Sequence, residues 1–264
     1  MTVKIGIHGA GGRMGRRLMC LAAKDPELAV TEAVDWEKHP AMGSLVRSFE
    51  PDAPGGVYLK TAFSGASDLI IDFSMPDGTA KIVAYALEKK VPVVIGTTGI
   101  GDEQAATIRN AAKSIPVVWA SNYSLGVNLL LRVASDVAKA LGPEFNVEIV
   151  EAHHNKKADA PSGTALSLAK SVCAALGRDI KKDLVHGRSG APGPRTVGEI
   201  GMHALRMGSI VGDHTVHFGS EFERIELTHR AQTRDVFAAG ALRAAKWVAG
   251  RAPGLYDMQD VLFG

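Results

Sequence analysis

The sequence has little of what marks several special classes of protein. Of its 264 residues only two are cysteines, Cys20 and Cys173, and their spacing fits neither a metal site nor a disulfide framework. The formal net charge is only +2, which is too small to indicate a nucleic-acid partner. No apolar run approaches the roughly 20 residues that a transmembrane helix needs, and the first residues do not form a charged-then-apolar leader. These absences predict a cytoplasmic protein with reduced thiols and with neither a nucleic-acid nor a membrane partner.

The sequence does contain enough apolar material for a sizeable core. Hydrophobic residues make up 46% of the chain and charged residues 22%, a balance that is typical of a globular protein. The length accommodates two modest domains or one large one. The motifs that carry chemistry are therefore expected within folded domains.

The amino-terminal segment has the arrangement of a dinucleotide-binding site. Residues 3–8 are β-prone and lead directly into a glycine-rich turn, which is followed by a helix-like segment at residues 16–23. The glycines are spaced as G-x-x-G-x-x-G, through Gly9, Gly12 and Gly15. Such a turn lets the backbone and a helix N-terminus approach a pyrophosphate. The alternative is a glycine turn that only packs a helix against a strand.

An acidic residue stands where this kind of site needs one. Asp35 ends a predicted strand at residues 28–34, about twenty residues beyond the glycine turn, where an acid bonds the adenosine ribose. Trp36, Lys38 and His39 follow it. Because the two cations can accept a 2′-phosphate, the sequence leaves both NADH and NADPH open as cofactors.

Strands and helices alternate through the rest of the first half. Short apolar runs at residues 68–73, 91–95 and 116–119 predict strands, separated by helices at residues 78–89 and 102–113. This alternation is typical of a Rossmann-like, doubly wound parallel sheet, which binds ligands at the carboxyl ends of its strands. The residues expected at the cofactor are Gly9, Ala10, Gly11, Gly12, Arg13, Met14, Asp35, Gly96, Thr97, Thr98, Ala120, Ser121, Asn122 and Tyr123. For the threonines and the asparagine, ordinary turn chemistry is the alternative.

The pattern changes in the second half of the chain. Helices are predicted at residues 127–141 and 164–176, and a polar, glycine-rich excursion at residues 178–198. Three later segments alternate apolar and polar residues, which predicts antiparallel or mixed strands with one covered face. These strands span residues 200–206, 214–218 and 224–230.

The chain is therefore expected to form two domains. A dinucleotide-binding domain comprises residues 1–124 and is completed by residues 234–264, whose helix at 234–249 is expected to return to it. A substrate-binding α+β domain with a mixed sheet comprises residues 125–233. The last segment, residues 255–263, has no strong pattern of its own.

The groups suited to chemistry concentrate between a predicted strand at residues 146–150 and the helix at residues 164–176. This cationic segment, residues 151–166, reads EAHHNKKADAPSGTAL and contains two histidines and two lysines. Ser162 or Thr164 is the expected N-cap of the helix, whose free N–H groups then face an anion. The combination suits a carboxylate-bearing substrate that is protonated after a hydride arrives. The alternative is a solvated basic loop.

A metal site is not expected in the cationic segment. Its adjacent histidines raise the question, but the sequence has no H-E-x-x-H motif and no cysteine cluster, and nearby lysines repel a cation. Four other histidines fall within predicted strands, where structural roles are expected for most of them. They are His203, His214, His217 and His229.

Five motifs together resemble one enzyme family. They read GAGGRMGR from Gly9, GTTGI from Gly96, ASNYSLGVN from Ala120, EAHHNKKADAPSGTA from Glu151 and IVGDHTVHF from Ile210. They are similar to those of the 4-hydroxy-tetrahydrodipicolinate reductases, also called dihydrodipicolinate reductases, and the resemblance runs over nearly the whole chain. It implies that NADH or NADPH reduces a cyclic, unsaturated dicarboxylate to tetrahydrodipicolinate, with loss of water, in the diaminopimelate route to lysine. It also implies a homotetramer assembled through the sheets of the second domain.

The resemblance implies roles within the cationic segment. His153 and Lys157 match acid and base positions, with Lys157 as the proton donor to the ring carbon beside the one that takes the hydride. His154, Gly163 and Thr164 match contacts to the substrate carboxylates.

Two positions depart from the family pattern. Many members carry an arginine after the ribose-binding acid, where this chain has Trp36, and many read R-x-G-D-I-V-G, where this chain has Ser209. Two rival hypotheses share the first domain. One is a related NAD(P)-dependent dehydrogenase of an amino or semialdehyde acid, and the other is a non-catalytic NAD(P)-sensing protein.

Overall fold

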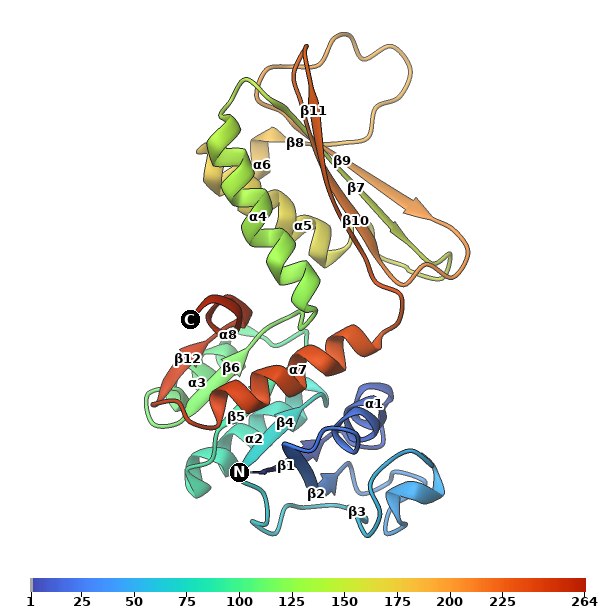
Figure 1. Cartoon of the computed structure of the whole chain (residues 1–264), viewed down its shortest axis with the longest axis vertical. Helices are drawn as coiled ribbons and strands as arrows, with labels where there is room; N and C mark the ends of the chain where they lie inside the picture. The colour runs from blue at the N-terminus through green and yellow to red at the C-terminus, as the bar shows by residue number, and fades with distance from the viewer. Residues whose placement is uncertain (1) are drawn as a thin grey trace. The chain divides into compact units, whose positions relative to one another are not determined.

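The computed structural model describes residues 2–264, which form two compact units (Figure 1). The first unit comprises Met1–Leu125 and Phe237–Gly264, and the second comprises Gly126–Val236. The first contains a parallel seven-stranded sheet and the second a mixed five-stranded sheet. The predicted fold class, a Rossmann-like doubly wound sheet with a second α+β domain, is therefore confirmed.

The sheet of the first unit has the strand order β12-β6-β5-β4-β1-β2-β3, and each of its pairs is parallel. Its strands are β1 (Val3–His8), β2 (Leu28–Val34), β3 (Leu59–Lys60), β4 (Leu69–Asp72), β5 (Val93–Ile95), β6 (Pro116–Trp119) and β12 (Gly254–Tyr256). The order reverses between β1 and β4, because the chain winds outward from β1 to β3 on one side and from β4 to β6 on the other. Ligands of such sheets bind beyond the carboxyl ends of the strands at this reversal.

Helices cover both faces of this sheet because its strands are apolar on both sides. Leu69 and Ile71 of β4 pack with α1 (Arg13–Ala22), α7 (Asp235–Val248) and α8 (Met258–Phe263). Ile70, between them, packs on the opposite face with α2 (Pro76–Lys89) and α3 (Asp102–Ala111). Successive strand residues point to opposite faces, so the central strands β4, β5 and β6 each contribute to both cores. A short 3-10 helix, η1 (Val46–Ser48), lies between β2 and β3 in the chain.

The sheet of the second unit has the order β11-β10-β7-β9-β8. Its strands are β7 (Asn146–His153), β8 (Leu184–His186), β9 (Ile200–Arg206), β10 (Asp213–Gly219) and β11 (Arg224–Arg230). The strand β10 is antiparallel to β7 and β11, whereas β7, β9 and β8 run parallel. The helices of the unit are α4 (Leu125–Leu141), α5 (Gly163–Leu176) and α6 (Ile180–Asp183).

Only one face of the second sheet contributes to the helix-covered core. Val147 and Ile149 of β7 are buried there with residues of α4 and α5, and Figure 1 shows both helices on that side of the sheet. The opposite face, called here the outer face, carries the alternate strand residues. They include Glu148, Val150, His203, Leu205 and Thr215, all partly or largely exposed.

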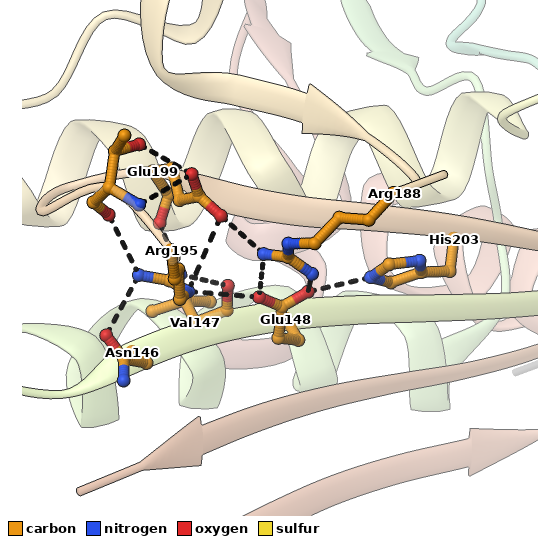
Figure 2. Close-up of polar contacts among 8 residues, drawn as sticks. Asn146, Val147, Glu148, Arg188, Arg195, Glu199 and His203 are labelled. Atoms are coloured by element: carbon orange, nitrogen blue, oxygen red, sulfur yellow. Dashed lines mark hydrogen bonds and ion pairs between the residues drawn. The ribbon is translucent and has the colours of Figure 1, made fainter. Parts of the chain in front are cut away.

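An ion-pair cluster, called here the arginine latch, holds the glycine-rich segment of residues 187–199 to this sheet (Figure 2). It comprises Glu148, Arg188, Arg195 and Glu199. The Arg188 guanidinium donates to both Glu148 oxygens, at 3.2 and 2.7 Å, and also pairs with Glu199. Arg195 donates from Nε to Glu148 at 3.1 Å. His203 adds a 2.7 Å contact to the same carboxylate.

The structure adds short elements that the sequence pattern does not show. The excursion expected at residues 178–198 contains α6 and β8, and the patternless carboxyl terminus contains β12 and α8. The strand expected at residues 146–150 continues to His153. Short edge strands lack a periodicity long enough to detect, and they form because a neighbouring strand supplies hydrogen-bond partners. Within residues 2–264 the structure contains no helix that is long and apolar enough to cross a membrane.

Candidate functional site

The glycine turn adopts a backbone that only glycine allows at several points. Gly9 has φ of +77°, and a Cβ placed there would lie 2.5 Å from the carbonyl oxygen of Phe73. Gly12 is the N-cap of α1, and its lack of a side chain leaves the first N–H groups of the helix open to a ligand. Gly15 packs against the backbone of Gly9 and Ala10, where a Cβ would overlap. The glycines therefore bring α1 close to β1.

Asp35 lies against the glycine turn, as the sequence predicts for a ribose-binding acid. The Gly11 N–H donates to its Oδ2 at 2.7 Å, and the Trp36 N–H donates to its Oδ1 at 2.8 Å. Each carboxylate oxygen keeps a further lone pair for a hydroxyl group. The Trp36 side chain is 59% exposed at this rim.

Basic side chains close to the turn support it. Arg16 donates from Nε to the Gly11 carbonyl oxygen at 2.8 Å, and its guanidinium lies 5.0 Å from the centroid of the Phe49 ring. The His39 ring fills the space beside Gly11, and its Nδ1 accepts from the Ala41 N–H at 3.1 Å. Lys38 is exposed.

A buried carboxylate joins the ends of the central strands, and no motif in the sequence indicates its role. Asp72 is fully buried and accepts from His8 Nδ1 at 2.7 Å, where β1 and β4 lie side by side. The hydroxyls of Ser74, Thr79 and Thr97 also donate to it, at 2.6, 2.5 and 2.9 Å. Burial by itself would raise the pKa of Asp72, but these hydrogen bonds outweigh it and hold the pKa below its usual value. An anionic Asp72 thereby fixes the strand ends beside the glycine turn.

At the other strand ends expected near the cofactor, several side chains form hydrogen bonds within the protein itself. Tyr123 is buried, and its hydroxyl lies 2.9 Å from the Ile95 carbonyl oxygen and 3.1 Å from that of Val118. Asn122 accepts from the Ser124 N–H at 2.9 Å. Among the other residues of these strand ends, Thr98 and Ser121 are exposed, and Gly96 and Ala120 are partly exposed. In the glycine turn, Ala10 is buried, Arg13 is exposed and Met14 packs on the core.

The site in the first unit fits a dinucleotide on its own geometry. A turn that excludes side chains, an uncapped helix N-terminus and a carboxylate at the turn are the three parts that hold pyrophosphate and ribose. All three lie at the carboxyl edge of the first sheet, beside the reversal of strand order.

The cationic segment joins β7 to α5 in the second unit. His153 is the last residue of β7, and α5 begins at Gly163. Ser162 is the N-cap, because its Oγ accepts from the Ala165 N–H at 3.2 Å, which confirms one of the two caps expected. Gly163 is exposed and Thr164 half-buried in the first turn of α5.

His153 is held in one orientation by a buried acid. Its Nδ1 lies 2.6 Å from Oε2 of Glu151, which is fully buried two residues earlier on the same face of β7. This contact leaves Nε2 as the second functional nitrogen of the ring. A Cβ on Gly212 would lie 3.1 Å from that Nε2, so the glycine leaves it room.

Lys157 is paired with a carboxylate. Its Nζ donates to the two Asp159 oxygens at 2.8 and 2.9 Å. This bond lowers the pKa of Asp159. The Lys157 N–H donates to the His154 carbonyl oxygen at 3.1 Å, and His154 itself is half-buried.

His214 contacts the cationic segment at Ser162 and His153. Its Nε2 lies 3.1 Å from Ser162 Oγ, and its ring meets that of His153 edge-on at 5.2 Å. Burial lowers the pKa of His214 to about 4, so the ring is neutral near pH 7. The expected structural role of this histidine agrees with these contacts. Within the described part of the chain, residues 2–264, no group of three or more His, Cys, Asp or Glu side chains is arranged to hold a metal ion.

Both halves of the chain match models of one protein family. The model described as dihydrodipicolinate reductase, N-terminus, matches residues 3–123. The model described as dihydrodipicolinate reductase, C-terminus, matches residues 126–262.

Full-length relatives carry a consistent name. The 4-hydroxy-tetrahydrodipicolinate reductase of Halorhodospira halophila is 45% identical over 265 residues, which cover 99% of each chain. That of Geobacter metallireducens is 47% identical over 263 residues, covering 98% of each. A solved structure of dipicolinate-bound dihydrodipicolinate reductase from Paenisporosarcina sp. TG-14 is similar with a TM-score of 0.75, at 24% identity, covering 97% of this chain and 98% of that one. At this identity the solved structure supports the fold.

Proposed function

The chain belongs to the dihydrodipicolinate reductase family, and we propose that it reduces 4-hydroxy-tetrahydrodipicolinate to tetrahydrodipicolinate with NADH or NADPH. In this reaction the substrate takes up a hydride and a proton and releases water. The product belongs to the diaminopimelate route to lysine. The observation that carries the proposal is the match of both halves, over nearly the whole length, to relatives named for this enzyme.

The bound cofactor supplies the hydride, and the chain supplies position and the proton. We assign cofactor binding to the glycine turn, Asp35, residues 96–98 and residues 120–123. The turn and Asp35 support this assignment by their contacts, whereas Tyr123 would contribute through its backbone, since its side chain is used in the core.

We assign the substrate to the cationic segment. Gly163 and Thr164 lie in the first turn of α5, where a Cβ placed on Gly163 would meet no atom within 4 Å, and with His154 they would bind the carboxylates of the substrate. Lys157 would donate the proton to the ring carbon beside the one that takes the hydride, and its Nζ is held by the two Asp159 oxygens at 2.8 and 2.9 Å. His153, oriented through Nδ1, would act through Nε2.

The activity is tested by following NADH and NADPH absorbance with enzymatically generated 4-hydroxy-tetrahydrodipicolinate. Pyridine-2,6-dicarboxylate, which is doubly acidic and inert, should compete. Turnover of an amino or semialdehyde acid in its place would favour the related dehydrogenase, and cofactor binding without oxidation of any cyclic dicarboxylate would favour a sensor.

The role of Lys157 is tested by Lys157→Ala. Loss of a general acid lowers rates by about 10²- to 10⁴-fold, so kcat should fall in that range while the affinity for NADH stays unchanged. Lys156→Ala removes the exposed neighbouring ammonium and serves as the matched control. Turnover of Lys157→Ala at the wild-type rate would remove this side chain from the mechanism.

We further propose that the enzyme is a homotetramer in the cytoplasm. The support for assembly is the outer face of the second sheet, where Leu205 is 47% exposed opposite Ala152, on the same face as the half-buried Val150. The support for the compartment is that Cys20 and Cys173 are buried and unpaired, as expected of thiols in a reducing environment. On this proposal, residues 1–124 with 234–264 bind the cofactor, and residues 125–233 bind the substrate and assemble.

A further inference from the structure

One guanidinium in the second unit, that of Arg206, bonds to two groups near the proposed proton donors. These are the Glu151 carboxylate, which contacts His153, and the backbone of the segment that carries Lys157. Arg206 is the last residue of β9 and lies opposite His153 in the register of β7 and β9. Its NH1 donates to Glu151 Oε2 and its NH2 to Glu151 Oε1, both at 2.8 Å. The same NH2 group donates to the Asp159 carbonyl oxygen at 2.7 Å.

Glu151 receives four donors, and Arg206 supplies two of them. The others are His153 Nδ1 at 2.6 Å and the Ser162 N–H at 3.0 Å. Burial by itself would raise the pKa of Glu151, but these hydrogen bonds, with that of Arg206 the largest, hold it below its usual value. Without Arg206 the fully buried carboxylate would lose its permanent counter-charge, and an uncompensated buried charge tends to take up a proton. A protonated Glu151 would no longer be the acceptor that orients His153.

The second contact acts on Lys157. Arg206 holds the main chain at Asp159, and the Asp159 carboxylate holds the ammonium of Lys157. Residues 154–159 are exposed or half-buried and contribute no side chain to the core clusters of the unit. The guanidinium is therefore a tether between this segment and the sheet.

We propose that Arg206 is a positioning residue for the proposed reaction: through Glu151 it orients His153, and through the Asp159 backbone it places Lys157, so that one side chain aligns both proton-handling groups. The inference rests on the proposed function for its kinetic part and on the contacts above for its structural part.

The geometry requires the planar fork of arginine. NH1 also donates to the Leu205 carbonyl oxygen at 2.6 Å, so the two terminal nitrogens make four directed bonds. Lysine has a single nitrogen and cannot span the two Glu151 oxygens and the Asp159 carbonyl group together. Arg206→Lys therefore keeps the counter-charge and removes the alignment.

The test compares Arg206→Lys with Arg188→Lys. Arg188 also donates to both oxygens of a glutamate on β7, but in the arginine latch. We expect Arg206→Lys to lower kcat by about tenfold to a hundredfold, the scale of a misplaced catalytic group, with a smaller change in KM and an unchanged Kd for NADH. Arg188→Lys should keep kcat. Light scattering and urea unfolding of both variants check that mass and fold are retained.

A second readout is independent of activity. The imidazole ¹⁵N signals of His153 in the substrate-free protein report its Nδ1 bond, and they should move in Arg206→Lys and not in Arg188→Lys. If Arg206→Lys fails to fold, Glu151→Gln takes its place, because it removes the carboxylate through which Arg206 acts and should move the same signals. Wild-type kcat together with unmoved His153 signals overturns the proposal. A wild-type protein without reductase activity would overturn the proposed function, while the His153 signals still decide the role of Arg206.

Discussion

At the scale of single residues, both units use a buried carboxylate paired with a histidine at the end of a strand. Asp72 binds His8 in the first sheet, and Glu151 binds His153 in the second. In each case burial opposes the charge, and directed hydrogen bonds outweigh it. A neutral substitute would leave several donors unsatisfied, which costs about 1–3 kcal/mol for each buried group. These acids therefore set the geometry of groups that are closer to a ligand.

The position of Asp35 leads to a prediction about cofactor choice. Its carboxylate lies at the turn where the adenosine ribose would bind, and Arg16 and His39 are already used in supporting that turn. A 2′-phosphate on that ribose would lie against this carboxylate, and the exposed Arg13 and Lys38 would offset the repulsion only through solvent. We expect Kd for NADH to be lower than for NADPH by about tenfold, or about 1.4 kcal/mol, measured by nicotinamide fluorescence.

Substitution of the acid checks the cause of that preference. Asp35→Ala should weaken NADH binding and narrow the difference between the two cofactors. Glu37→Ala, which removes an exposed acid two positions further along, should change neither. Equal affinities in the wild-type protein would show that Asp35 does not select against the phosphate.

At the scale of elements, the arginine latch fixes a segment that has little core of its own. Residues 187–199 contain four glycines with positive φ, at 187, 190, 193 and 198. Burial opposes the charge of Glu148, but hydrogen bonds from Arg188, His203 and Arg195 lower its pKa to about 2. Thr196 and Arg188 lower that of Glu199 to about 2. Since both folded-state pKa values lie below the ordinary value of 4.5, the latch stabilises above that pH and is lost as pH falls toward 2.

The latch predicts protection from trypsin, which cleaves after arginine. Arg188 and Arg195 are both held by Glu148, so the native protein at pH 8 should resist cleavage at these two positions. Glu148→Gln should release the segment and increase the cleavage rate there severalfold, as read by mass spectrometry of the fragments. Glu226→Gln, which breaks an exposed pair with Arg224 on the same sheet, should leave the rate unchanged. Equal rates in both variants would mean that the segment is held by other contacts.

At the scale of the whole molecule, the outer face of the second sheet predicts the state of assembly. A tetramer would contain four copies of the 27.8 kDa chain. Leu205→Asp places a charge on the outer face and should shift the mass measured by light scattering to smaller species. Leu255→Asp changes a leucine of similar exposure, 44%, on β12 of the first unit, and should keep the wild-type mass. A wild-type monomer would contradict the proposed assembly.

Much of the fold followed from local patterns. The bounds of β1, β2, β6, β9 and β11 coincide with the predicted runs, because each is an uninterrupted apolar or alternating stretch with turn residues on both sides. β8, β12 and α6 were missed, since segments of three or four residues carry no periodicity. Ser162 was found as an N-cap because capping is local.

No contact among residues 2–264, which the structure describes, explains why this chain has Ser209 at its departure from the family pattern.

By itself, the sequence determined the alternation of strands and helices, the glycine turn with its acid, and the cationic segment between a strand and a helix, because each is specified by neighbours along the chain. Only the tertiary structure decided which groups hold the functional side chains. Asp72 is 64 residues from His8, and Arg206 is 55 residues from Glu151. Strand pairing brings each pair together, and the register of a sheet is fixed by the packing of its whole core.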